Sequence, residues 1–152
     1  MTWWLMKTEP DEFSIDDLER VGVEPWTGIR NYQVRNWIRD RMAIGDGVLI
    51  YHSNCAEPGV VGIGEICSSA FPDLTQFDPA SDYHDPKSTR AEPRWLARDV
   101  RFVRRLTKPV TLARMRTTPA LEGFQLLARG NRLSILDVTP AQLSVLLDLE
   151  QS

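Results

Sequence analysis

Residues 45–68 read GDGVLIYHSNCAEPGVVGIGEICS, and this stretch decides the fold class. Two apolar runs, Val48–Ser53 and Val60–Ser68, predict strands, and the turn-forming residues between them predict a hairpin-like connection. Gly62 and Gly64 stand two apart on one face of the second predicted strand. Glycines in such positions mark a sharp bend or the close approach of another backbone segment. The stretch therefore favours strands that curl into a small barrel.

The rest of the chain adds short strands and short helices in irregular order. Further strands are predicted at Trp3–Lys7, Trp95–Leu106 and Leu133–Val138. Helices are predicted at Ser14–Glu19, Asn31–Met42, Thr111–Met115 and Thr139–Leu149, with a helical or irregular piece at Pro119–Leu127. A long loop is expected over residues 71–94. Because strands and helices do not alternate regularly, the pattern favours an α+β fold on a small mixed barrel, with one domain over residues 1–152.

Composition excludes several classes of protein. Hydrophobic residues make up 42% and charged residues 26% of the chain, values typical of a globular domain rather than of a disordered or coiled-coil sequence. No apolar run reaches the roughly 18–20 residues of a membrane span, and the N-terminal residues lack the features of a signal peptide. Two cysteines form no disulfide framework, so we expect a reducing, cytoplasmic location and no membrane partner.

Charge is distributed unevenly along the chain. The net charge is −3, but residues 1–86 carry 6 basic and 15 acidic side chains, whereas residues 87–132 carry 12 basic and 3 acidic ones. Such an asymmetry between segments is a sign of nucleic-acid contact. The alternative is that folding brings the opposite charges together as internal ion pairs, and the sequence leaves both open.

Catalytic and metal-binding motifs are missing from the sequence. The glycine-containing run at residues 59–64 lacks the Gly-Lys-Ser/Thr ending of a phosphate-binding loop. His52 and His84 do not stand at metal-ligand spacing from Cys55 or Cys67. No pair of residues forms an evident nucleophile and base. We therefore expect no metal, no cofactor and no enzymatic activity.

Aromatic residues point instead to binding. The chain has five tryptophans, and Trp26 stands in a loop rich in proline and glycine, where burial in a core is not the default. Trp26, Asn31, Tyr32 and the Ser53-Asn54 turn could form a pocket for a flat ring. Nucleic-acid bases are commonly bound by stacking on aromatic side chains and by hydrogen bonds to their edges.

Seven segments, in order, resemble one known family. They are Trp4–Pro10, Trp26–Asn36, Tyr51–Cys55, Gly59–Gly62, Tyr83–Ser88, Pro93–Trp95 and Arg132–Ile135. In this order and spacing they closely resemble the EVE domain family, and the resemblance covers essentially the whole chain. It implies a fold of the PUA-like superfamily, a small mixed β-barrel flanked by short helices. It also implies a non-enzymatic reader of modified bases, particularly modified cytosine in DNA, although some PUA-like relatives bind RNA.

The resemblance further implies a set of base-binding residues. Trp26 would form an aromatic wall, with Asn31 and Tyr32 beside it. Ser53 and Asn54 would supply hydrogen bonds from the facing turn. Lys7, Arg132 and Ser134 would either close the site or meet a phosphate.

The basic segment would then hold the nucleic-acid backbone. We expect phosphate contacts from Arg98, Arg101, Arg104 and Arg105. Phosphate contacts position a protein on nucleic acid but do not specify a sequence. Two other functions remain open: an RNA-binding module without preference for a modification, and a sensor of a nucleoside or another small molecule. The oligomeric state is also open.

Overall fold

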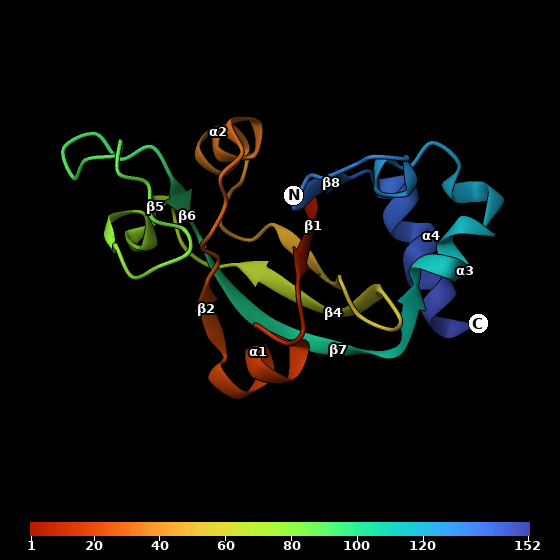
Figure 1. Ribbon diagram of the computed structural model, residues 1–152. Coiled ribbons are helices and arrows are strands. Elements are labelled where there is room, and N and C mark those ends of the chain that lie inside the picture. The colour runs from red at the N-terminus through yellow and green to blue at the C-terminus, as the bar shows by residue number, and fades with distance from the viewer.

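The computed structural model describes all of residues 1–152, and its main feature is a mixed six-stranded sheet that curls into a half-barrel (Figure 1). The strands of this sheet follow the order β2-β7-β4-β3-β1-β8. Their bounds are β1 Trp3–Thr8, β2 Val23–Pro25, β3 Gly47–His52, β4 Gly59–Ile66, β7 Asp99–Thr111 and β8 Ile135–Val138. A second sheet pairs only β5 (Phe71–Pro72) with β6 (Leu96–Ala97). The predicted α+β class is confirmed.

Four α-helices flank the half-barrel. They are α1 (Ile15–Val21), α2 (Tyr32–Asp40), α3 (Leu112–Arg116) and α4 (Pro140–Gln151). Short 3-10 helices are η1 (Leu74–Phe77), η2 (Pro119–Leu121) and η3 (Gln125–Leu127). In Figure 1, α3 and α4 cover one end of the molecule, whereas α1 and α2 pack nearer the end that carries β2, β5 and β6. The fold therefore leaves the segment between β2 and α2 facing the end of β1.

The central strands are buried on both faces, which explains their uninterrupted apolar sequences. Trp4 and Met6 of β1 belong to one core cluster with helices α1 and α2, whereas Leu5 belongs to a second cluster with α3 and α4. Residues 48–51 of β3 divide between the two clusters in the same alternating way. Strand β1 runs parallel to β3, which is the pairing that buries both.

The glycines of β4 permit the close approach that the sequence predicted. A Cβ atom on Gly62 would lie 3.1 Å from the carbonyl oxygen of Arg104, and one on Gly64 would lie 2.9 Å from that of Arg101. Both oxygens belong to β7, whose register against β4 shifts twice. These contacts let β7 wrap across β4 and curl the sheet.

Several boundaries differ from the prediction. Strand β2 and the elements β5 and η1 lie in segments predicted as loops, because each is too short to show a periodic pattern. The strand predicted at Trp95–Leu106 is divided into β6 and β7 at Arg98, whose side chain donates to the carbonyl oxygens of Ile38 and Ser68. The helix predicted at Ser14–Glu19 is confirmed as α1, and Ser14 and Asp17 cap it with a reciprocal capping box.

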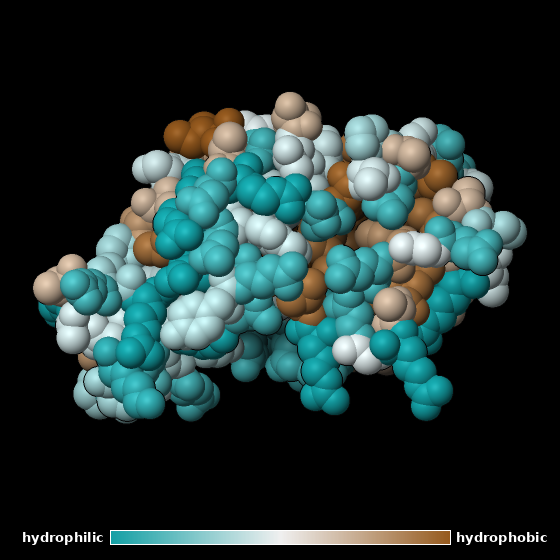
Figure 2. Space-filling model, turned by 90° about the horizontal axis from the view of Figure 1, so that it is seen from above, coloured by the Kyte–Doolittle hydropathy of each residue, from teal (hydrophilic) through white to brown (hydrophobic).

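The surface is mostly polar on the face drawn in Figure 2. Hydrophilic residues cover most of its left half, and hydrophobic ones gather in a hollow on the right half, toward α3 and α4. No helix is both long and apolar enough to cross a membrane.

Candidate functional site

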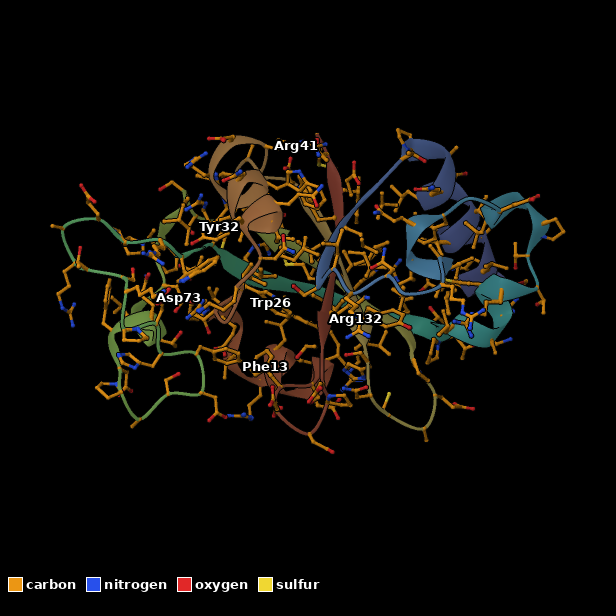
Figure 3. The ribbon with its side chains drawn as sticks, turned by 45° about the horizontal axis from the view of Figure 1, so that its top comes forward. Phe13, Trp26, Tyr32, Arg41, Asp73 and Arg132 are labelled. Carbon is orange, nitrogen blue, oxygen red and sulfur yellow. The ribbon has the colours of Figure 1, made fainter.

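A cavity of about 380 Å³ opens between the end of β1 and the segment that joins β2 to α2. This volume falls in the range of small-molecule sites. The walls come from five parts of the chain, and its lining residues are Lys7, Thr8, Glu9, Glu12, Phe13, Glu24, Pro25, Trp26, Thr27, Gly28, Ile29, Ser53, Tyr83, Arg132 and Ser134. We call this cavity the ring pocket. Figure 3 shows Trp26 and Phe13 at the site, with Arg132 on the side of β1 and β8.

Aromatic side chains form one wall of the ring pocket. Trp26 is 8% exposed, and its ring meets the Phe13 ring edge to face, with centroids 6.2 Å apart and planes at 88°. Tyr83 adds a third ring, which packs so closely on Gly28 that a Cβ atom there would lie 2.9 Å from it. Flat, rigid surfaces of this kind suit a planar ligand.

The loop that carries Trp26 is held from behind by Asp73. Its carboxylate is fully buried and accepts hydrogen bonds from the Gly28 amide at 2.8 Å and from Arg30 at 3.1 Å. Arg30 also donates to the carbonyl oxygen of Tyr83 at 2.7 Å. Burial opposes the charge on Asp73, but hydrogen bonds from Thr75, Gly28 and Arg30 outweigh burial and lower the pKa of this carboxyl. Asp73 therefore fixes the pocket loop while remaining outside the pocket.

Charges of both signs line the ring pocket. Lys7 and Arg132 are basic, and Glu9, Glu12 and Glu24 are acidic. Burial lowers the pKa of Lys7. Burial raises the pKa of Glu24, and nearby carboxylates add to this shift. The pocket can thus offer both hydrogen-bond donors and acceptors to a ligand.

Five of the eight predicted base-binding residues line this pocket together. They are Lys7, Trp26, Ser53, Arg132 and Ser134. The hydroxyl groups of Ser53 and Ser134 make no hydrogen bond within the protein, which leaves both free for a ligand.

The other three lie outside the ring pocket and have structural partners. Asn31 is the N-cap of α2 and accepts from the Val34 amide at 3.0 Å. Tyr32 is half-exposed and packs on the Trp95 ring, with centroids 4.7 Å apart. Asn54 donates to Glu9 and lines a neighbouring cavity instead.

The four arginines expected on a phosphate backbone all have partners within the protein, which counts against that expectation. Arg98 is buried and bonded to backbone carbonyl groups. Arg101 pairs with Glu65 at 2.6 Å, and Arg104 pairs with Glu150 at 2.7 Å. Arg105 is paired with Asp16 and Glu19 of α1. For this strand the internal-pairing alternative is therefore the right one.

Sequence reasoning missed the residues that complete the wall and the acidic side of the ring pocket. Phe13 directly precedes the N-cap of α1, a position where an apolar residue often packs back onto its own helix, so its contact with Trp26 gave no signal. Tyr83 lies 57 positions from Trp26, and only tertiary structure brings it to Gly28. Glu24 stands in a segment predicted as an open loop, which hid its partial burial in β2.

Comparison with known proteins identifies relatives along the whole chain. A family model for the EVE domain matches residues 2–149. Thymocyte nuclear protein 1 of Homo sapiens is 37% identical over 167 residues, which cover 97% of this chain and 73% of the relative.

Solved structures agree with this match. The crystal structure of a protein from Pseudomonas syringae superposes with a TM-score of 0.93 at 47% identity, covering 97% of this chain and 99% of that one. The crystal structure of human THYN1 protein in complex with DNA containing 5-methylcytosine gives a TM-score of 0.93 at 36% identity, covering 100% and 99% of the two chains. The chain, which matches the family model and these relatives over nearly its full length, belongs to the EVE domain family.

Proposed function

We propose that this protein is a non-enzymatic reader of modified cytosine in DNA, and that the ring pocket holds the modified base. The observation that carries the proposal is a pocket with an aromatic wall, free hydroxyl groups and basic residues at its edge. The human relative crystallised with DNA containing 5-methylcytosine supports the choice of ligand.

Stacking on Trp26 would compensate for taking the base out of its duplex. Extrusion of a base costs a few kcal/mol of lost stacking and pairing. Base–aromatic stacking restores about 1–3 kcal/mol per base. Phe13 packs perpendicular to the Trp26 ring, which orients that ring before a base arrives.

The polar side of the pocket fits the hydrogen-bonding edge of cytosine. The cytosine amino group donates, and carboxylates are its usual acceptors. Glu12 and Glu24 line the pocket, and neither makes an ion pair or a side-chain hydrogen bond within the protein. Thymine presents a carbonyl oxygen in place of the amino group, so these carboxylates favour cytosine over 5-methyluracil-type bases.

The serines of the pocket are not activated as nucleophiles, which supports a non-enzymatic role. A serine nucleophile needs a base within hydrogen-bond reach. Neither Ser53 nor Ser134 has such a partner, and the adjacent His52 uses its Nε2 to accept from the Ile15 amide at 3.0 Å.

Binding of matched oligonucleotides tests the proposal. Fluorescence anisotropy at one fixed salt concentration would compare duplexes with and without 5-methylcytosine, the same sequence as RNA, and free 5-methylcytidine. We expect the modified DNA duplex to bind most tightly. Trp26→Leu should weaken that binding about 5- to 150-fold, the equivalent of one lost stacking contact.

Trp37→Leu is the control, because Trp37 packs against the same core cluster as Trp26 but lies on α2 outside the pocket. Melting temperatures of both variants separate a binding defect from loss of fold. Equal affinity for modified and unmodified duplexes would overturn the proposal, as would binding that Trp26→Leu leaves unchanged. Tightest binding to RNA or to the free nucleoside would assign the pocket to one of the other two functions.

A further inference from the structure

Most basic side chains of this protein already have a partner. Of the 18 lysines and arginines, 13 make an ion pair, a hydrogen bond or a contact over an aromatic ring. Five make none of these, namely Lys7, Lys87, Arg116, Arg129 and Arg132. Four of the five line two adjoining cavities, so the free positive charge is concentrated in one region of the surface.

The second of these cavities lies beside the ring pocket and shares Lys7 and Ser53 with it. Its volume is also about 380 Å³, and it is formed by the ends of β3 and α3 and by the segment 128–131. Lys7, Arg116 and Arg129 line it, and no aspartate or glutamate does. This contrasts with the ring pocket, where three glutamates balance the basic residues.

The segment 128–132 adds further donors. The backbone amides of Arg129, Gly130 and Arg132 have no acceptor within the protein. Arg129 and Arg132 are three residues apart, so their Cα atoms lie at most about 11 Å from one another. Arg129 lines the second cavity and Arg132 lines the ring pocket, so this segment places a basic side chain on each cavity.

Resting on the proposed function, we propose that the second cavity is a phosphate site for the nucleic-acid backbone next to the extruded base. Arg116 and Arg129 hold a phosphodiester there, and Lys7 stands where this backbone track meets the ring pocket. The backbone then runs between α3 and the segment 128–132 and not along β7, whose arginines are neutralised by Glu65, Glu150 and α1.

The state of Lys7 agrees with this assignment. Its ammonium group is half-buried and has no acidic partner, and burial lowers its pKa. A phosphate at the junction of the two cavities would supply the missing counter-charge. Sequence-independent affinity of this kind comes from neutralised phosphates and falls steeply with salt.

The test is the salt dependence of DNA binding in two double variants of equal charge change. One is Arg116→Ala with Arg129→Ala, and the other is Arg101→Ala with Arg105→Ala on β7. A plot of log affinity against log salt has a negative slope, and each phosphate contact removed makes that slope shallower by about 1. The Arg116/Arg129 double variant should therefore have a slope shallower by about 2, for modified and unmodified duplexes alike. Over a four-fold rise in salt, that difference in slope corresponds to about 16-fold in relative affinity.

The second pair should leave the slope unchanged, because its charges are already neutralised within the protein. An unchanged slope in the Arg116/Arg129 variant, or an equal fall in both variants, would overturn the phosphate site. A fall confined to the Arg116/Arg129 variant in a protein that does not discriminate modified DNA would support the phosphate site and overturn the modified-base proposal. Inorganic phosphate alone, titrated against both variants, gives the remaining outcome. If binding of inorganic phosphate requires Arg116 and Arg129 while DNA binding does not, the cavity binds free anions only, and the proposed contact with the DNA backbone is overturned.

Discussion

Replacing Asp73 with asparagine tests how the pocket loop is held. Asp73 is fully buried and accepts four hydrogen bonds, from the Gly28 amide, from Arg30, and from the amide and hydroxyl of Thr75. Asp73→Asn keeps the size of the side chain but removes its charge. One carboxylate oxygen becomes an amide nitrogen, which is a donor placed among donors. The variant should therefore loosen the loop that carries Trp26 without opening a large cavity.

The size of the effect follows from the burial of the pair. Breaking a buried ion pair by removing one partner costs about 3–5 kcal/mol. Arg30 has 22% of its side chain exposed and retains its bonds to Tyr83 and Ile29, which places the expected cost near the lower limit, at about 3 kcal/mol. In a domain of this length that loss corresponds to about 6–12 °C in melting temperature.

Thermal unfolding and hydrogen exchange together measure this prediction. Melting temperature gives the global loss, and the exchange rate of the Gly28 amide reports directly on the bond to Asp73. Asp82→Asn is the control, because Asp82 lies on the same long loop but is exposed and unpaired. A melting temperature within about 2 °C of the control's would refute the assigned cost. Unchanged exchange at Gly28 would refute the role of Asp73 in holding the loop.

Two further predictions concern stability. His52 is neutral in the folded protein because its Nε2 accepts from the Ile15 amide and burial lowers its pKa, so the unfolded chain takes up a proton first as pH falls. The unfolding free energy should therefore decline from about pH 7 toward pH 5. It should decline less in His52→Gln, because glutamine keeps a hydrogen-bond acceptor. Equal declines for the two proteins, measured by urea titration, would contradict this. Gly59→Ala should lower stability by about 1–3 kcal/mol, because its Cβ would lie 2.5 Å from the carbonyl oxygen of Val110. A wild-type urea midpoint in this variant would show that β7 can move away.

The predictable parts of the fold are segments long and apolar enough to show a strand pattern in the sequence. The apolar run Val48–Ser53 predicted a strand, and the structure has this strand as β3, with side chains in both core clusters. Strand β2 was not predictable, because three residues that end in Pro25 carry no period. Its pairing with β7 exists only once both are placed at the same sheet edge.

The candidate site was predictable where a residue type was unusual for its place. Trp26 in a proline- and glycine-containing loop is such a case. Asn31 is not, since an asparagine before a helix looks the same in sequence whether it caps the helix or binds a ligand, and here it caps. Charge arithmetic along the chain failed for β7 because the acidic partners of its arginines come from segments far away in sequence.

The charge count along the chain was nevertheless informative about residues 87–132 as a whole, although it was not informative about β7. Residues 87–132 contain four of the five basic residues without a partner, three of which line the two cavities. Four basic residues without a partner line the two cavities, namely Lys7, Arg116, Arg129 and Arg132. If each contacts one phosphate, log affinity for duplex DNA should fall with log salt with a slope no steeper than about −3.6, against about −10 for a strongly electrostatic repressor. Sequence-independent attraction to DNA is therefore modest in this protein. On the proposed function, discrimination comes from contacts inside the ring pocket, so a net charge of −3 is compatible with that proposal.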